Sequence, residues 1–316
     1  MTLRWIALVA LSLVGSAIAP AASAQESVWR SYLDSARKAA DQGDHRAAER
    51  FLAMADNEAS AFPSGDTRRI EAWTARAALA EGQFHYDVAE ALHKRSLAFA
   101  TRLKKDEVIA HASAVLADHY RLRGKFDLAE PLYRKALAIR ERVNGPNAWE
   151  TAQLLRDLAD LERDAGKFDA AEALYRRALT ILEGTKGPEF QSASCLANLG
   201  ELYVREGKLV EAEALSRRAD AIYESLKVPL HLNRALCEGT LGEALRLRKK
   251  SAEAEEAFSA AVVHIDDGKL NTIRVADVLA NAAKSARETG KIAQAGALEG
   301  RATALRESHR KANAAK

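Results

Sequence analysis

A repeated phrase constrains this chain more than any other feature of its sequence. It reads GKFDAAEALYRRALTIL at residues 166–182, GKFDLAEPLYRKALAI at 124–139 and GKLVEAEALSRRADAI at 207–222. The phrase thus returns with a period of about 42 residues, and self-similarity at such a period is typical of stacked repeat proteins. In these proteins each unit buries its apolar face against the next. We therefore expect a repetitive fold that serves as a binding scaffold.

The composition predicts helix nearly throughout. The 316 residues are 48% hydrophobic and 29% charged, with only 6 prolines. Such a chain is too apolar to stay disordered, and its frequent Ala, Leu, Glu and Arg are strong helix formers. The formal net charge is +3, and basic and acidic residues alternate without a long basic run. We therefore expect no nucleic-acid partner.

Seven corners at nearly equal intervals divide the chain into pairs of helices. They are Gly43, Phe84, Gly124, Gly166, Gly207, Lys249 and Gly290. The expected pairs are 27–42 and 45–60; 67–82 and 86–103; 107–123 and 126–143; 148–165 and 168–184; 190–206 and 209–226; 231–248 and 251–265; 271–289 and 292–308. A left-handed backbone at each corner suits Gly, and Asp169 is expected to cap the second helix of the fourth pair. The pattern predicts an all-α fold.

The order of residues within each unit resembles the tetratricopeptide repeat (TPR). The matching positions of units three to five are Leu116, Ala117, Tyr120, Gly124, Phe126, Ala129, Tyr133 and Ala136; Leu158, Ala159, Gly166, Phe168, Ala171, Tyr175 and Ala178; and Leu199, Gly200, Tyr203, Gly207, Ala212 and Ala219. HEAT and armadillo repeats have similar periods but lack the Gly–aromatic corner and this phrase. The unit length resembles the longer, ~42-residue subtype seen in kinesin light chains.

The resemblance implies an α-solenoid, a right-handed superhelix of about seven helix-turn-helix pairs over residues 25–309. Residues 310–316 are expected to form a polar tail that frays. Three departures from the repeat pattern stand out: Glu162 replaces the tyrosine of the first helix in unit four, Lys249 replaces a corner Gly, and the unit around Phe84 has an uncertain register.

Residues 1–24 have the pattern of a secretory signal peptide. Met1–Arg4 supply positive charge, Trp5–Ala19 are uncharged and largely apolar, and Ala22-Ser23-Ala24 form a small-residue cleavage site. The alternative is a buried helix of the mature fold, which Pro20 and the small residues disfavour. We expect an exported protein, periplasmic in a double-membraned host or else secreted. No later apolar run reaches the ~20 residues needed to span a bilayer, so no membrane insertion is expected after cleavage.

The two cysteines, Cys195 and Cys237, occupy the same position in successive repeats. Equivalent positions of neighbouring helices lie roughly 8–10 Å apart, whereas a disulfide needs Cα atoms within about 7 Å. We therefore expect two buried free thiols.

No motif predicts catalysis, a cofactor or a metal site. The recurring Gly-Lys pairs lack the context of a phosphate-binding loop and are interpreted as solvated turns. His85 and His93 are eight residues apart, as are His111 and His119, which is not the spacing of a helical zinc site. The histidines are interpreted as ordinary surface or groove residues, and the protein is expected not to be an enzyme.

Charged residues recur at fixed positions of the first helices, which line the concave groove in TPR stacks. Acids lie six residues before the corner and arginines three before it, so each acid can pair with its Arg at i, i+3. Two interpretations stay open: a self-neutralising solvated face, or a groove that binds an extended peptide through its arginines. The candidate partner-binding residues are His111, Asp118, Arg121, Arg156, Asp160, Arg163, Glu201, Arg205, Glu243, Arg246, Lys284 and Arg287.

The function predicted from the sequence is that of an exported, non-enzymatic scaffold. It would bind a protein or extended peptide in its groove, within an envelope assembly, secretion or regulatory complex. One alternative is a structural protein that self-associates as a homo-oligomer through helix 292–308. A less favoured alternative is a small-ligand receptor with its pocket near Phe84–Tyr86.

Overall fold

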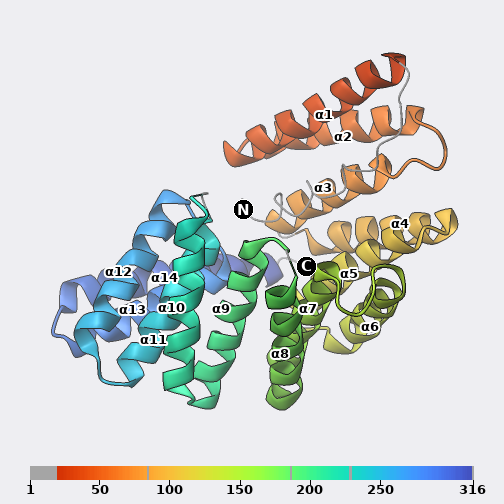
Figure 1. Ribbon diagram of the computed structural model, residues 1–316. Coiled ribbons are helices and arrows are strands. Elements are labelled where there is room, and N and C mark those ends of the chain that lie inside the picture. Colours follow the sequence, from red (N-terminus) through yellow and green to blue (C-terminus); the bar gives the residue numbers. More distant parts are fainter. Residues whose placement is uncertain (1–19, 84, 186, 228–229, 315–316) are drawn as a thin grey trace. The chain divides into compact units, whose positions relative to one another are not determined.

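A computed structural model describes residues 20–83, 85–185, 187–227 and 230–314. Within these ranges the chain forms fourteen α-helices and no strand (Figure 1). They are α1 Pro20–Asp41, α2 His45–Ala61, α3 Arg68–Gly82, α4 Tyr86–Leu103, α5 Asp106–Leu122, α6 Phe126–Val143, α7 Trp149–Asp164, α8 Phe168–Gly184, α9 Glu189–Glu206, α10 Leu209–Ser225, α11 His231–Leu247, α12 Ser251–Asp267, α13 Ile273–Glu288 and α14 Ile292–Ala314. The expected all-α fold of stacked helix pairs is confirmed.

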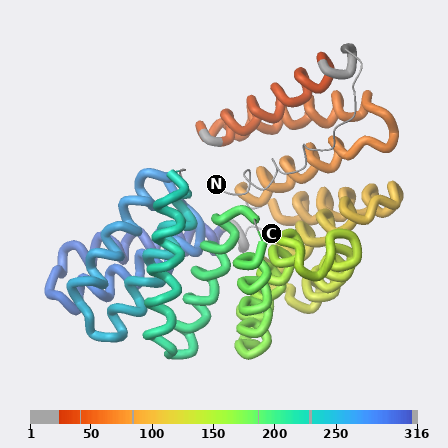
Figure 2. The backbone as a smooth tube through the Cα atoms, in the orientation of Figure 1, coloured from red at the N-terminus to blue at the C-terminus, as the bar shows by residue number. Residues whose placement is uncertain are grey.

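The chain divides into two compact units, Met1–Ile139 and Arg140–Lys316. In the first unit α1 packs on α2 and α3 on α4, and α3 also contacts α2. In the second unit the pairs are α7 with α8, α9 with α10, α11 with α12 and α13 with α14. Figure 2 traces the backbone through these pairs as a tube. Within each unit, helix pairs therefore contact the helix that comes next along the chain, which is how a repeat covers the apolar face of its neighbour.

The corners adopt the backbone that the sequence predicts. The φ angles of Gly43, Gly124, Gly166, Gly207 and Gly290 lie between 68° and 79°. Lys249 adopts the same left-handed conformation with φ 62°, although it carries a Cβ. Its amide donates to the Arg246 carbonyl at 3.0 Å, and the next amide donates to the Leu245 carbonyl at 2.9 Å. The corner thus satisfies carbonyls at the end of α11 even where Gly is missing. Phe84 lies outside the described residues.

Small residues hold the two helices of each pair close together. Alanines seven residues apart on the second helices are fully buried: Ala129 and Ala136, Ala171 and Ala178, Ala212 and Ala219, and Ala254 and Ala261. A methyl group at these positions leaves room for a neighbouring helix to approach closely. Tyr133 and Tyr175 occupy equivalent positions, and Tyr223 lies two turns further along its helix. All three are also fully buried.

The recurring Gly-Lys phrase has a structural role that the sequence did not reveal. In four repeats the Lys after the corner pairs with the Glu that follows the first buried alanine of the preceding second helix. The pairs are Lys125 with Glu90, Lys208 with Glu172, Lys250 with Glu213 and Lys291 with Glu255. The interpretation as simple solvated turns was incomplete, because these half-exposed lysines link one repeat to the next.

Several expectations can be compared with the described residues. Cys195 and Cys237 are buried and free, as predicted. Asp169 does not cap α8, whose N-cap is Lys167; it lies in the first turn, where its charge favours the helix dipole. The described part of the predicted polar tail is helical, since α14 continues to Ala314 through residues with high helix propensity.

The predicted signal peptide lies largely outside the described residues, which begin at Pro20. Among the helices that the structure does describe, none combines the length and apolarity required to cross a bilayer.

The left-handed corners predict opposite effects for two substitutions. Lys249→Gly removes the steric cost of a Cβ at φ 62° and should raise the free energy of unfolding by about 0.5–1 kcal/mol. Gly166→Ala introduces that cost at φ 77° and should lower the free energy of unfolding by about 1 kcal/mol. A Cβ at Gly166 meets no atom within 4 Å, so the loss would reflect backbone strain alone. Urea unfolding measures the free energy of unfolding of both variants. If both variants shift it in the same direction, the assignment of backbone strain to these corners is wrong.

Candidate functional site

The predicted groove residues all lie on the first helices of their pairs. The first unit places His111, Asp118 and Arg121 on α5. The second unit places Arg156, Asp160 and Arg163 on α7, Glu201 and Arg205 on α9, Glu243 and Arg246 on α11, and Lys284 and Arg287 on α13. In the second unit α9 contacts both α7 and α11, and α11 contacts α13. The structure therefore assembles the second-unit residues on adjacent helices.

Arg163 is the most buried member of the group. Its side chain is 4% exposed, and its guanidinium lies 3.5 Å from Asp160, 3.1 Å from Asp164 and 3.2 Å from Glu201 of the next repeat. Burial opposes its charge, but the surrounding carboxylates outweigh that effect and raise the pKa of Arg163 above its usual value. Arg163 therefore organises the charged face from inside and does not offer a free guanidinium to a partner.

Asp160 is held by two neutral side chains as well as by Arg163. The Tyr175 hydroxyl on α8 donates to Oδ1, and the Asn198 amide on α9 donates to the same oxygen at 2.9 Å. In the first unit the equivalent Tyr133 donates to Asp118 at 2.6 Å. In both repeats the buried tyrosine of the second helix thus fixes the acid of the first helix, a contact that the i, i+3 spacing did not suggest.

Glu201 lies at the centre of a cluster that reaches across three helices. Its carboxylate forms ion pairs with Arg205 of the same helix at 2.9 Å and with Arg274 of α13 at 3.0 Å. Neighbouring helix axes lie about 8–10 Å apart, so α9 and α13 would be roughly 16–20 Å apart on a flat face. The contact with Arg274 therefore crosses over α11 and joins α9 to α13 on this face.

The cluster keeps Glu201 ionised. Burial alone would raise the pKa of its carboxyl, but attraction by Arg163, Arg274 and Arg205 outweighs burial and lowers the pKa to about 2. Arg205 and Arg274 remain 45% and 44% exposed. The fixed carboxylate therefore orients two guanidinium groups whose other donors face solvent, as hydrogen-bonding to carboxylates or carbonyls requires.

The remaining predicted residues of the second unit are also paired. Arg246 forms a two-point contact with Glu243, both at 2.8 Å, and reaches Glu288 of α13 at 2.6 Å. Arg156 donates to Asp157 at 2.9 Å and also to Gln191 of α9. The expected pairing of each acid with its arginine is confirmed for Asp160, Glu243 and, in the first unit, Asp118, which lies 3.3 Å from Arg121.

Lys284 and Arg287 lie at the outer side of the last pair, away from the Glu201 cluster. Lys284 donates to Asn281 at 3.1 Å, and Arg287 pairs with Glu299 of α14. With Asp277 and Arg306 they line a surface groove between α13 and α14. A polar outer face on a terminal repeat is what solubility of a stack requires.

The first unit contains a cationic pocket that sequence analysis missed. The Arg95 guanidinium lies 4.2 Å from the centre of the Trp73 ring, and Arg69 lies 5.8 Å from it. Arg102 lies 4.9 Å from the centre of Phe99, and the five residues line a pocket of about 520 Å³. Among the described residues, no carboxylate lies within ion-pair distance of these three arginines. The spacing of 95, 99 and 102 on one face of α4 was the only signal in the sequence.

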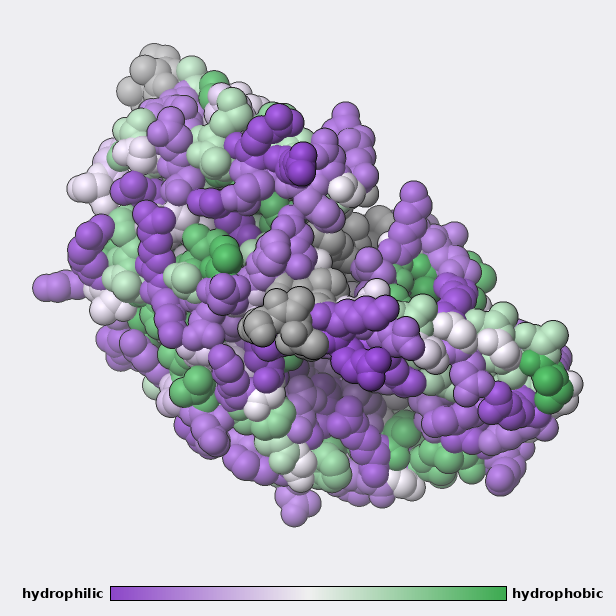
Figure 3. Space-filling model, turned by 180° about the vertical axis from the view of Figure 1, so that it is seen from behind, coloured by the Kyte–Doolittle hydropathy of each residue, from purple (hydrophilic) through white to green (hydrophobic). Residues whose placement is uncertain are grey.

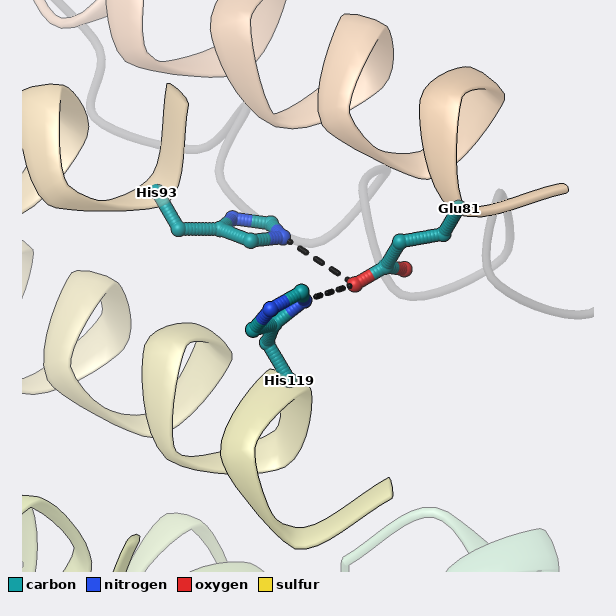
Figure 4. A group of neighbouring side chains, drawn as sticks. All are labelled: Glu81, His93 and His119. Atoms are coloured by element: carbon teal, nitrogen blue, oxygen red, sulfur yellow. Dashed lines mark hydrogen bonds and ion pairs between the residues drawn. The ribbon is translucent and has the colours of Figure 1, made fainter. Parts of the chain in front are cut away.

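A second cluster in the first unit corrects the interpretation of the histidines. His93 and His119 are 3% and 2% exposed, and both meet Glu81 in the interior (Figure 4). They are therefore neither surface nor groove residues, and a carboxylate–histidine cluster does exist. The sequence did not reveal it because the two histidines lie on different helices, so no spacing along a single helix relates them. His111 is half-buried on α5.

The comparisons with known proteins match this arrangement. Residues 107–184 and 192–262 match the family model described as Tetratricopeptide repeat. The chain is a TPR protein. The matched ranges cover α5–α8 and most of α9–α12, and the pairs outside them repeat the same helix-turn-helix geometry. Comparison with curated protein sequences gives no match.

Solved structures of low sequence identity are similar to this chain. The apo form of RapI is 13% identical over 90% of this chain and 99% of its own, with a TM-score of 0.66. A Rap protein complexed with Competence and Sporulation Factor is 15% identical over 90% of this chain and 76% of its own, with a TM-score of 0.60. A putative kinesin light chain from Podosopora anserina is 18% identical over 63% of this chain and 95% of its own, with a TM-score of 0.48.

The pKa of Glu201 predicts how stability depends on pH in this TPR protein. The carboxyl has a lower pKa in the folded chain than in the unfolded chain, so its ion pairs stabilise the fold fully above pH 4.5 and are lost as the pH falls toward 2. Glu201→Gln should therefore cost about 1–3 kcal/mol at pH 7, and the difference from the wild type should shrink below pH 4.5.

Urea unfolding between pH 7 and pH 3 measures this difference. The control is Glu183→Gln, which removes a carboxylate that is 42% exposed and pairs with Arg218 on the second helices. It should cost less than about 1 kcal/mol at any of these pH values. Equal losses of unfolding free energy in the two variants would show that the ion pairs of Glu201 stabilise the fold no more than one exposed ion pair does.

Proposed function

We propose that this chain is an exported, non-enzymatic TPR scaffold that binds an acidic protein or extended peptide on its concave face. The face of α9, α11 and α13 is the proposed binding surface, and the partner would belong to an envelope assembly, secretion or regulatory complex. The observation that carries the proposal is the Arg274–Glu201 contact, because it gathers two half-exposed guanidinium groups beside one carboxylate on the first helices, which line the groove in TPR stacks.

The surface chemistry supports a charged partner more than an apolar one. On the face shown in Figure 3 hydrophilic residues dominate, and hydrophobic residues form small separate patches. Exposed Arg side chains bind carboxylates and backbone carbonyls through two parallel hydrogen bonds. The arginine pocket around Trp73 offers the same chemistry in the first unit. A partner with acidic side chains would therefore suit both surfaces.

The likeness to Rap proteins supports the fold's capacity to hold a ligand. The Rap structure named above contains Competence and Sporulation Factor, so a protein of this architecture forms a complex with a separate molecule. Peptides bind repeat proteins by lying along an extended surface that successive repeats build. The adjacent first helices of the second unit supply such a surface here.

The double variant Arg205→Ala/Arg274→Ala tests this surface. Wild-type protein crosslinked in its native compartment should capture a discrete partner. The double variant should capture at least about tenfold less of that partner, because one exposed charge-assisted contact is worth about 1.4 kcal/mol. The matched control is Arg177→Ala/Arg218→Ala on α8 and α10. Those arginines are 44% and 55% exposed and also ion-paired, so the control changes charge equally.

Capture that drops equally in both double variants would indicate a general charge effect and contradict the assignment of the concave face. Capture that persists in Arg205→Ala/Arg274→Ala but fails in Arg95→Ala/Arg102→Ala would move the binding surface to the arginine pocket. Circular dichroism of each variant confirms that the helices are retained.

Export is the part of the proposal that rests on residues 1–24 alone. Signal peptidase should cleave after Ala24, because small residues occupy the positions before the cut. The N-terminus of the mature protein, read by mass spectrometry after expression in its native compartment, should therefore be Gln25. A protein that retains Met1 and stays with the cytoplasmic fraction would contradict export without affecting the binding surface.

A further inference from the structure

Three consecutive helices of the first unit bring one carboxylate and two imidazoles to a single point. Glu81 lies in the last turn of α3, His93 in the middle of α4 and His119 in the last turn of α5. In Figure 4 both rings point toward the Glu81 carboxylate from different helices. The three side chains are therefore held by separate rigid elements, which is how proteins fix binding groups precisely.

The distances suit a shared ligand. Glu81 Oε1 lies 2.8 Å from His119 Nδ1 and 3.4 Å from His93 Nε2. The potential ligand atoms of the three residues all lie within 4.8 Å of one another. Around a tetrahedral Zn²⁺ with bonds of about 2.0–2.2 Å, neighbouring ligand atoms are roughly 3.3–3.6 Å apart. Shifts of about 1 Å, within the reach of side-chain rotation, would place all three atoms on one ion.

A second carboxylate lies near the other side of the His119 ring. Its other ring nitrogen, Nε2, faces the Glu90 carboxylate at 4.0 Å. Glu90 is itself held in place by Lys125 at 3.1 Å and by the Tyr120 hydroxyl, which donates to it at 3.1 Å. A carboxylate on this side of the ring can accept the Nε2 proton of a metal-bound imidazole after a small shift, as outer carboxylates do for metal-binding histidines.

We propose that Glu81, His93 and His119 form a Zn²⁺ site with two nitrogen ligands, one oxygen ligand and a fourth position for water. Neutral imidazole and carboxylate are both common zinc ligands, and the set of two His and one Glu occurs in known zinc proteins. The rings are almost fully buried and Glu81 is 9% exposed, so the Glu81 carboxylate would offset one of the two charges of the ion in a weakly screened interior. The ion would join α3, α4 and α5 where one repeat meets the next.

Zinc uptake by the full chain tests the site directly. Protein stripped with a chelator and dialysed against buffered Zn²⁺ should bind one ion per chain, and Co²⁺ should give the intense visible absorption of a tetrahedral nitrogen–oxygen site. His93→Gln and His119→Gln should each abolish the stoichiometric ion and the Co²⁺ band. The matched control is His85→Gln, an exposed histidine at the start of α4, which should bind as the wild type does.

Two further measurements keep the proposal testable if the histidine variants unfold. Glu90→Gln leaves the three ligands in place and should weaken Zn²⁺ affinity by about 10–100-fold, as loss of an orienting carboxylate does elsewhere. Zn²⁺ at about 100 times its dissociation constant should also raise the melting temperature of the wild type by about 5 °C. Absence of stoichiometric zinc from the wild type, or uptake that His93→Gln and His119→Gln leave unchanged, would overturn the proposal.

Discussion

The close approach of helices at buried alanines is the interaction on which the rest of the structure depends. Two alanines seven residues apart on each of four second helices, such as Ala171 and Ala178, are fully buried. Larger side chains there would separate the helices, and overpacking a tight interior typically costs about 1–3 kcal/mol. Only with this spacing can the corner lysine of one repeat reach the glutamate of the repeat before it, as Lys208 reaches Glu172 at 2.8 Å.

Charge on the first helices serves structure at one depth and, in the proposed function, binding at another. Buried Arg163 is saturated by carboxylates, including Glu201 of the next repeat at 3.2 Å, and sets the relation between α7 and α9. Half-exposed Arg205 and Arg274 share Glu201 but keep donors in solvent. Of the two interpretations of the sequence, the self-neutralising face describes buried Arg163, and the proposed peptide-binding groove would use the exposed donors of Arg205 and Arg274. Burial decides between them.

The two units offer different chemistry on the same architecture. The second presents a charged face on α9, α11 and α13, whereas the first combines a set of guanidiniums around Trp73 with a buried cluster of Glu81, His93 and His119. Both features of the first unit arise where α3, α4 and α5 depart from the Leu- and Ala-rich pattern. A repeat scaffold can carry such local sites because most contacts of each repeat are with its neighbours. A substitution at one site therefore leaves the rest of the stack intact.

The sequence by itself determined the period and the six corners that lie among the described residues. It also determined most helix boundaries to within a few residues, the buried thiols and the local acid–arginine pairs. These follow from short-range rules, because helix periodicity and corner geometry act over a few residues. Only the tertiary structure decided that Arg274 reaches Glu201 and that His93 meets His119 and Glu81. Those contacts join unlike positions of different repeats. They depend on the curvature and rotamers that many packed side chains set together, and no spacing in the sequence encodes these.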